Sequence, residues 1–503
     1  MRDQLWEQFG VKEGLFDEKE ILWRGTRRTV EFVFGNAGDP RELADERFTP
    51  PEDGRVCFVV DYPWDDETHR FFSYDFQRVT KLQENLEAPT LVWLPDFFSE
   101  QRKAQLGRLM RINFLLERNR LDEYTRTYAP DDRVEARRQL ELGRDTLTST
   151  LVAALGEVHG ISQPREGTTA AEVVDGRHVL SLEPRYPRPE LEGGKSFADN
   201  VQHLADGMFG ACHAKHPDFG TDRHGQRKAV TPGELRTALE WITKAMDEDG
   251  RVEVEPKDLA TVKRIVEPLE LGTVHDGPLV LRADWRTRIN QAAAQHGERD
   301  ELAVENIRRW ITEKPLEYTG LDRQTSNLLI TAYALLDDRA WALNSGAENT
   351  APELSAIGPG WSLRSQPLPG EAEYDKARER AARLFGVPAK AHPYARNVNK
   401  LAGEVRAKAD EFEKNVAGVR AALERHAGLL GTETGTGTDT TGPRAAILRE
   451  AAGLLARLGR HGSDATGLVK ELAAAAYTTP DRELALTRAG GHAGAVSGPG
   501  ARP

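Results

Sequence analysis

Three short apolar runs near the N-terminus each end in polar or acidic residues. They read Trp23-Arg-Gly-Thr-Arg-Arg-Thr-Val-Glu-Phe-Val-Phe-Gly-Asn36, Val56-Cys-Phe-Val-Val-Asp-Tyr-Pro-Trp-Asp-Asp66 and Thr90-Leu-Val-Trp-Leu-Pro-Asp-Phe-Phe98. Val and Phe favour strands, and clusters of Gly, Pro and Asp separate the first two runs. Strands of this kind present ligands at the carboxyl edge of the sheet in α/β nucleotide enzymes. The pattern therefore predicts a partial α/β sheet within residues 1–100.

The pattern predicts which residues form the core of this sheet and where its first strand begins. Val33, Phe58, Val60 and Trp93 each lie within a run of β-forming residues and are expected to share one sheet core. No strand is predicted before Trp23, so one edge of the sheet is expected to lack a neighbour. An unpaired edge is normally covered in proteins.

Helical patterns follow from residue 99 onward. A helix is predicted from Ser99 to about Arg120, with Leu106, Leu109, Met110 and Leu116 near one stripe. A second helix is predicted from Pro130 to Val158, because proline and two acids favour a helix N-terminus. A short strand is expected around 178–182, inside a loop-like region. Further helices are predicted over 197–214, 232–247, 256–268, 299–312, 323–336, 373–385, 394–428, 443–460 and 464–476.

These elements predict an α+β N-terminal part, with a partial α/β sheet, followed by a mostly α-helical C-terminal region. We divide the chain into residues 1–160, 161–345 (mainly helical) and 370–485, a helical hairpin or bundle. Residues 187–194 and 343–369 read as linkers. The Gly/Thr tract 431–442 is of low complexity and is predicted to be a flexible loop within the last part.

Composition and charge argue against two classes of protein, those that coat nucleic acid and those that span a membrane. The 503 residues are 39% hydrophobic and 29% charged, with a net charge of −12. This balance argues against wholesale coating of nucleic acid, although a local basic patch can still contact DNA. No apolar run approaches the ~20 residues that cross a bilayer, so no membrane partner is expected. Two cysteines, Cys57 and Cys212, fit a reducing cytoplasm.

Asp61 ends the run Val-Cys-Phe-Val-Val, as the acid of a Walker B strand does when it binds Mg²⁺. Tyr62 follows where a second acid usually stands, and Asp65 and Asp66 come only after Pro63 and Trp64. The alternative is that Asp61 caps a turn, which is a common role for a strand-terminal aspartate.

A phosphate-binding loop should accompany such a strand. The segment Gly193-Gly-Lys-Ser196 matches the end of that motif, but Pro189 stands where its first glycine is required. Proline has no N–H to bind phosphate, so a linker loop is favoured here. The 503 residues contain no complete Gly-x-x-x-x-Gly-Lys-Ser/Thr sequence.

Possible metal ligands cluster between residues 203 and 224, but no metal is predicted. The cluster comprises His203, Cys212, His213, His216 and His224. Adjacent Cys212 and His213 suit one tetrahedral site poorly, and no second cysteine pair exists. Structural or surface histidines are favoured.

The most basic local region is Arg27-Arg28 together with the helix that begins after Ser99. Nucleic-acid contacts on that helix are assigned to Arg102, Lys103, Arg108 and Arg111. Interspersed acids favour a solvated helix face as the alternative.

Several segments together resemble one known family. They are Trp23-Arg-Gly-Thr-Arg-Arg28, Val33-Phe-Gly-Asn36, Val59-Val-Asp-Tyr-Pro-Trp-Asp-Asp66, Val92-Trp-Leu-Pro-Asp-Phe-Phe98 and Leu106-Gly-Arg-Leu109. They resemble the middle of the large P-loop ATPase subunit, of the PglY/BrxC type, in the Pgl and BREX phage-defence systems of bacteria. The later segments Ala129-Pro-Asp-Asp-Arg133 and His216-Pro-Asp-Phe219 fit more loosely.

The resemblance implies a phage-resistance subunit that restricts phage DNA within a multiprotein complex. Family members are similar in having a Walker A loop and an AAA-like core upstream of these motifs, so the chain is expected to be a truncated or split form. It implies nucleotide contacts from Asn36, Asp61, Asp65, Asp66, Arg27 and Arg28. ATP and Mg²⁺ are then expected only if a phosphate loop is supplied. The expected partners are other defence subunits, with DNA as a further candidate.

Three alternatives to this phage-resistance subunit stay open, and catalytic residues are not assigned from the sequence. The first is an NTPase fragment completed by a phosphate loop from another chain. The second is a DNA-contacting helical module without NTPase activity, and the third is a degenerate gene product without activity.

Overall fold

The structure is a computed structural model that describes residues 2–10, 16–52, 54–64, 72–171, 177–222, 224–344, 346–348, 351–425, 443–462 and 464–475. The chain forms two compact units. The first comprises Met1–Trp285 and Arg308–Leu329, and the second Arg286–Ile307 and Ile330–Pro503. Asp65, Asp66 and the Gly/Thr tract 431–442 lie outside the described residues.

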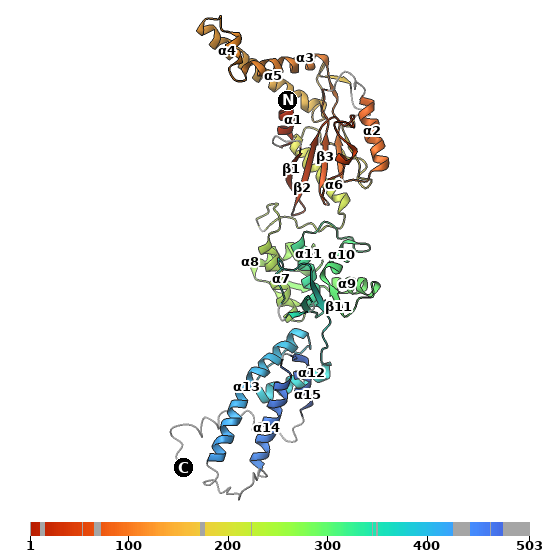
Figure 1. The fold of residues 1–503 in the computed structure, drawn as a ribbon. Coiled ribbons are helices and arrows are strands. Elements are labelled where there is room, and N and C mark those ends of the chain that lie inside the picture. The colour runs from red at the N-terminus through yellow and green to blue at the C-terminus, as the bar shows by residue number, and fades with distance from the viewer. Residues whose placement is uncertain are drawn as a thin grey trace. The chain divides into compact units, whose positions relative to one another are not determined.

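A five-stranded mixed sheet organises the N-terminal part of the first unit (Figure 1). Its strands, in spatial order, are β1 (Phe16–Trp23), β2 (Thr26–Phe34), β3 (Val56–Val60), β4 (Thr90–Trp93) and β7 (Val179–Ser181). β2, β3 and β4 are parallel, and the two edge strands pair antiparallel to them. The three predicted strands are therefore confirmed as the parallel centre of a sheet.

The expectation that the sheet begins at Trp23 is wrong. β1 precedes that residue and pairs with β2 along its whole length. Trp23 pairs with Thr26 across a two-residue turn in which Arg24 and Gly25 both have positive φ, of 44° and 75°. Turns with two positive φ values match the twist of paired strands, and glycine adopts them without strain. Charged residues dominate β1, which hid it from the hydrophobic pattern.

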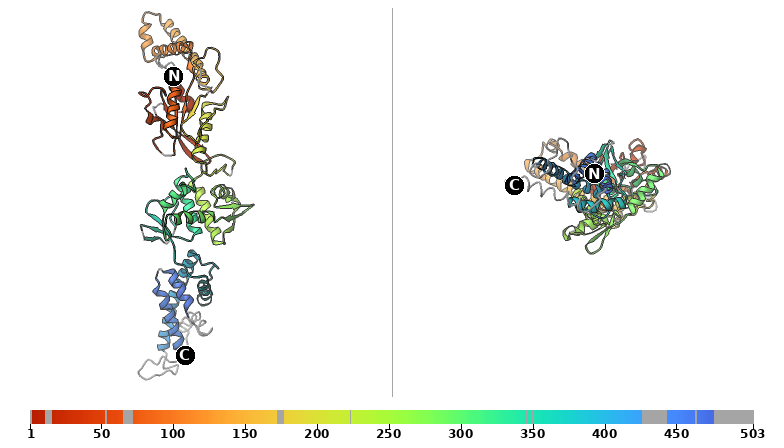
Figure 2. Two further views of the ribbon diagram at one scale, coloured as in Figure 1. Left: turned by 90° about the vertical axis from the view of Figure 1, so that its right-hand side faces the viewer. Right: turned by 90° about the horizontal axis from the view of Figure 1, so that it is seen from below.

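The sheet separates two apolar cores, so the four predicted core residues do not share one. Phe58, Val60 and Trp93 face α1 (Arg2–Phe9), the end of α5 (Pro130–Val158) and α6 (Phe197–Cys212). Val33 lies on the opposite face, with residues of α2 (Phe72–Asn85). Successive strand residues point to opposite faces, and Val33 pairs in register with Val59 rather than with Phe58. Figures 1 and 2 show helices on both sides of the sheet.

A helical hairpin, which we call the arm, projects from the sheet between β4 and β7 (Figures 1 and 2). It consists of α3 (Glu100–Leu116), α4 (Arg120–Tyr124) and α5, and α3 packs along α5. Ser99 caps α3 by accepting a hydrogen bond from the N–H of Arg102, and Pro130 opens α5, as predicted. At the base of the arm, β5 (Phe97–Phe98) pairs with β6 (Thr169–Ala171).

The predicted apolar stripe of α3 is corrected at one position. Leu109 and Ile112 are buried, whereas the side chain of Met110 is 65% exposed. Residues three apart share a helix face, but Met110 is turned by about 100° from Leu109. Its apolar side chain therefore points away from α5.

The remainder of the first unit contains a second, small sheet. α7 (Pro232–Asp247) and α8 (Pro256–Val266) confirm two predicted helices. They pack with a three-stranded sheet in the order β8-β10-β9, formed by Arg251–Glu253, Pro278–Leu281 and Gly272–Val274. These strands are three or four residues long, too short to show an alternating pattern in the sequence.

The second unit combines a four-stranded sheet with a helical bundle. The sheet has the order β11-β14-β12-β13, formed by Glu301–Ala303, Trp361–Arg364, Ala340–Leu343 and Gly346–Glu348. Residues 343–369, predicted as a linker, thus hold two of its strands. The helix predicted over 299–312 is preceded by β11 and begins only at Val304. α9 (Asp284–Gln295), α10 (Val304–Thr312) and α11 (Arg323–Leu336) span the boundaries between the units.

The C-terminal bundle agrees with the predicted helical region. It comprises α12 (Glu371–Arg380), which continues as a π-helical turn (Ala381–Phe385), and α13 (Ala395–Arg425), α14 (Pro443–Arg460) and α15 (Ala465–Ala474). α13 packs against α14 and α15 around one apolar core. An α+β N-terminal part and a mostly helical C-terminal region are therefore confirmed. None of the described helices is long and apolar enough to span a bilayer.

Candidate functional site

The parallel strands bring three polar side chains to one edge of the sheet. Asn36, Asp61 and Asp96 follow the carboxyl ends of β2, β3 and β4, and all three are buried. Carboxyl ends of parallel strands meet at one edge, which is where α/β folds bind ligands. Asn36 and Asp61 were predicted to lie here. Asp96 was not selected, although it follows the third apolar run in the same way.

Asn36 shapes the loop after β2. Its Oδ1 accepts hydrogen bonds from the N–H groups of Gly38 at 2.8 Å and Asp39 at 3.1 Å. A Cβ atom at Gly38 would collide with the carboxylate of Asp75, which belongs to α2. This close approach explains why glycine is needed there. α2 and Asp75 had no counterpart in the prediction from the sequence.

Asp61 is held in the turn that ends β3. Its Oδ1 accepts a hydrogen bond from the N–H of Tyr62 at 2.6 Å, and its own N–H donates to the carbonyl of Trp93 at 3.0 Å. Only 1% of Asp61 is exposed. These contacts are those of the turn-capping alternative, and nucleotide binding by Asp61 stays a prediction.

A buried histidine closes the inner side of this edge. His159, the C-cap of α5, donates from Nδ1 to the carbonyl of Leu155 at 2.8 Å, and its own carbonyl accepts from Trp93 Nε1 at 3.0 Å. Burial lowers the pKa of His159 to about 4. The ring is therefore uncharged at neutral pH and brings no positive charge to the sheet edge.

Arg27 and Arg28 lie at the other end of β2. Eight residues separate Arg28 from Asn36, which is about 26 Å along a strand. Arg27 is exposed and forms an ion pair with Glu20 at 3.0 Å. The six residues predicted to contact nucleotide are thus not gathered at one place: Asn36 and Asp61 share the carboxyl edge, and the two arginines do not.

Arg28 instead ties the β1–β2 hairpin to the loop before α11. Its Nη2 donates to the carbonyl of Gly320, and its guanidinium lies 5.3 Å from the ring centre of Trp23. Burial lowers the pKa of Arg28 to about 10, while the charge of Asp322 opposes that shift. The arginine remains charged at neutral pH, and this half-buried side chain links the hairpin to that loop.

Two members of the predicted histidine and cysteine cluster, His213 and His216, pack against Trp23, whereas His203 lies beside Glu192. The ring of His216 lies 4.8 Å from that of Trp23, and its Nδ1 donates to the carbonyl of Pro217 at 2.8 Å. Burial lowers the pKa of His216 to about 3 and of His213 to about 4. Within the described residues, no group of three or more His, Cys, Asp or Glu is arranged to hold a metal ion.

The segment Gly193–Ser196 forms a helix N-terminus. Ser196 caps α6 in a reciprocal capping box with Asp199. The N–H of Gly194 donates to the carbonyl of Ile161, and that of Lys195 to Glu192, each at 3.3 Å. These amides are therefore engaged with the protein itself, which accords with the loop favoured from the sequence.

The four basic residues assigned to nucleic acid divide into two groups. Arg102 donates to Gln105 and to Thr168, and the second contact ties α3 to the base of the arm. Lys103 pairs with Glu100 of the same helix at 3.6 Å. Arg108 and Arg111 are exposed and take part in none of the ion pairs that the structure describes. DNA contact by these residues stays a prediction.

Beside Arg111, the arm carries an apolar hollow that we call the notch. Met110, Arg111, Phe114 and Leu115 of α3 and Tyr124 of α4 line its volume of about 350 Å³. Three of these side chains are strongly exposed: Met110 by 65%, Phe114 by 49% and Tyr124 by 67%. The prediction from the sequence missed the notch, because an apolar residue on a helix is normally assigned to its buried face.

Three family models match the chain in succession. The model described as PglY fourth domain matches residues 1–213, and those of the fifth and sixth domains of the BREX system ATPase PglY protein match 233–334 and 378–498. Together they cover most of the chain, in the order of one protein. The chain belongs to the PglY family of the BREX system. No solved structure matches it.

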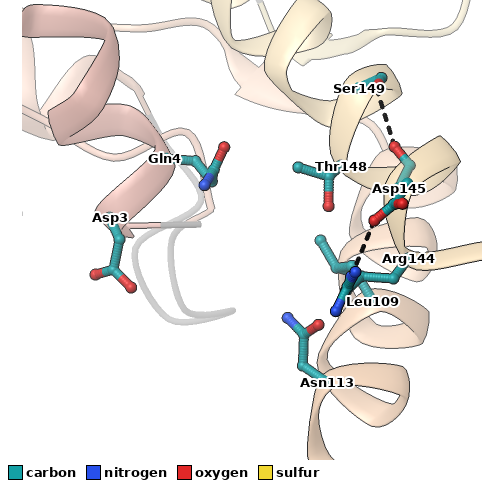
Figure 3. A pocket seen from close by; sticks show the side chains of 8 residues that line it. All are labelled: Asp3, Gln4, Leu109, Asn113, Arg144, Asp145, Thr148 and Ser149. Carbon is teal, nitrogen blue, oxygen red and sulfur yellow. Dashed lines mark hydrogen bonds and ion pairs between the residues drawn. The ribbon is translucent and has the colours of Figure 1, made fainter. Parts of the chain in front are cut away.

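The five-stranded sheet and the arm of this PglY-type chain both fall within the part matched by the fourth-domain model. A second hollow, of about 470 Å³, lies there between α1, α3 and α5 (Figure 3). Figure 3 shows Arg144 paired with Asp145 at 3.0 Å and Ser149 donating to the Asp145 carbonyl. Arg144 and the hydroxyl of Ser149 are thus both engaged with Asp145 of the same helix, and Asp3 of α1 adds a further carboxylate to the lining.

Proposed function

We propose that this chain is a phage-resistance subunit that works inside a multi-subunit BREX assembly and does not hydrolyse ATP by itself. The succession of three PglY domain models carries the proposal. Two further observations support it. The sequence contains no complete phosphate-binding loop, and Asn36 and Asp61 are engaged in turns at the sheet edge. In this reading ATP and Mg²⁺ act only where another segment or chain supplies that loop.

The experiment is a phage-plating assay in a host that carries the complete defence gene cluster. Deleting the gene for this chain is expected to restore plaque formation, and supplying the chain in trans is expected to abolish it again. Complementation by an Asp61→Ala variant is expected to protect as well as the wild type. Undiminished protection after the deletion would overturn the proposed role.

A DNA-contacting role for the arm is the second candidate. The observation in its favour is that Arg108 and Arg111 are exposed beside each other on α3. Phosphate contacts of this kind give affinity that falls steeply with salt. Filter retention of labelled duplex DNA at 50 and 200 mM salt, with an Arg108→Ser/Arg111→Ser double variant, tests it. Equal retention by variant and wild type would reject it.

A further inference from the structure

The arm concentrates the exposed apolar side chains of the protein. Eight large hydrophobic side chains are exposed among the described residues, and six of them lie on the arm. These six are Met110, Phe114, Tyr124, Tyr128, Val134 and Leu142. Single exposed apolar residues are ordinary, but several of them together mark an interaction surface. Met110, Phe114 and Tyr124 form such a group, because all three line the notch.

The notch is built as a receptor for large side chains. Met110 and Phe114 are one helical turn apart, on the side of α3 that faces away from buried Leu109 and Ile112. Tyr124 of α4 contributes the one lining side chain that does not come from α3. The guanidinium of Arg120 lies 4.1 Å from the ring centre of Phe114 and fixes that ring by a cation–π contact. This contact holds the Phe114 ring at one side of the hollow.

The arm carries a small excess of positive charge, although the whole chain is acidic. Between residues 100 and 145 there are eleven Lys and Arg and nine Asp and Glu, whereas the whole chain has 68 and 80. Many of the arm's acids are already paired: Glu117 with Arg120 at 2.8 Å and Asp122 with Arg137 at 3.6 Å. Arg111 lines the notch itself. Like Arg111, the exposed Arg108, Arg118 and Arg126 enter none of the described ion pairs.

From these observations we propose that the notch binds an amphipathic helix of another subunit, one that places two large apolar side chains in the hollow and carboxylates against Arg111. The proposal rests on the proposed function, because it names the surface through which the chain would join its assembly. Helices bind grooves in this way through apolar residues at i and i+3 or i+4. The rim charges then select the partner and its orientation.

Nucleic acid fits the notch less well than such a helix. Duplex DNA carries a negative charge about every 1.7 Å along its axis, so its groove needs a continuous run of cations. Acids such as Glu117 and Asp122 interrupt that run on the arm. A helix can instead place one carboxylate opposite Arg111 and keep its other face polar. The apolar side chains that line the notch, such as Met110 and Phe114, also cannot donate hydrogen bonds to phosphate.

The experiment is site-specific photo-crosslinking in the intact assembly. The photoreactive residue benzoylphenylalanine replaces Phe114 in the full chain, which is co-expressed with the proteins encoded beside it, purified and irradiated. Mass spectrometry is expected to identify one helical segment of another subunit, rich in Leu, Ile or Phe and in Asp or Glu. Arg111→Glu is expected to lower the yield at least tenfold, and Arg111→Lys to retain most of it. The same probe at Tyr74, an exposed aromatic residue of α2, is the matched control.

Several results would overturn the notch proposal. They are crosslinking to DNA, to a second copy of this chain or to a segment without carboxylates, equal yield from position 74, or no crosslink from position 114. The phage-plating assay separates the two proposals. If deletion of the gene abolishes protection but Phe114 gives no crosslink, the assembly role stands and the notch proposal fails.

Discussion

Individual histidine residues make the stability of the folded chain depend on pH. Burial lowers the pKa of His159 and His213 to about 4 and of His216 to about 3. These pKa values lie below the ~6.5 of an unfolded histidine. At a pH between the folded and the unfolded pKa, the unfolded chain therefore binds more protons than the folded chain. The contribution of these uncharged histidines to the free energy of unfolding is complete above pH 6.5 and is lost as the pH falls toward 4.

Replacing His159 by Gln should therefore reduce the loss of stability in acid. With a folded pKa near 4, wild-type His159 accounts for about 2 kcal/mol of stability lost between pH 7.5 and 5, and Gln does not titrate. Urea unfolding followed by tryptophan fluorescence at both pH values measures the difference. The control is His203→Gln, since the side chain of His203 is 43% exposed. Equal acid sensitivity of H159Q and wild type would contradict the assignment.

Asp61 provides a second test at this scale. The purified chain is expected to release no more phosphate from Mg²⁺–ATP than its Asp61→Ala variant, because Asp61 is engaged with the turn that ends β3 and the sequence has no complete phosphate loop. A colorimetric phosphate assay on both proteins is sufficient. Steady turnover that disappears in Asp61→Ala would show that the chain is a complete ATPase.

At the scale of elements, the central strands should dominate the stability of the sheet. Phe58 is fully buried in β3 and contacts the ring of Phe32, with centroids 5.5 Å apart. Phe58→Ala is expected to cost about 3–5 kcal/mol, as for other buried phenylalanines. Val134→Ala, at a position 69% exposed on α5, should cost under about 0.5 kcal/mol. Urea unfolding of the two variants measures both changes in the free energy of unfolding. A cost under about 1 kcal/mol for Phe58→Ala would show that β3 is not a central strand of the core.

The sequence predicts the elements that carry their own signal. β2, β3 and β4 are apolar enough to be recognised, and the positions of Asn36 and Asp61 follow from the parallel order of those strands. Arg28 precedes the apolar run that Asn36 follows, so chain order already places the two at opposite ends of β2. The family resemblance groups them, because it is applied to both motifs without regard to strand direction. β1 is masked by its charges, and β11 to β14 are too short to alternate. The notch depends on α3 and α4 meeting, which no single segment encodes.

At the scale of the whole molecule, the exposed arm rather than an open sheet edge calls for a partner. β1 pairs along β2 and is itself an edge strand of the sheet. Its charged residues, among them Glu18, Lys19 and Glu20, are of the kind that keep a sheet edge from pairing with another chain. Co-expression with the neighbouring defence genes is still expected to yield a particle heavier than the 55.9 kDa chain, measured by size exclusion with light scattering. Met110→Ser/Phe114→Ser should reduce that particle, and Tyr74→Ser should not. A mass that stays at one chain under co-expression would sink the prediction.

The pairing of β5 with β6 fixes the base of the arm, so the lengths of its helices determine how far the notch lies from the sheet. Both ends of the arm are fastened at one place, while α3 and α5 run outward from it side by side. Met110 and Phe114 come ten and fourteen residues after Glu100, which places them about 15–21 Å along α3 from its start. Removing seven matched residues from each helix would draw the notch back by about 10 Å and leave the sheet untouched. The lengths of α3 and α5 would therefore set the distance between the sheet and a partner bound at the notch.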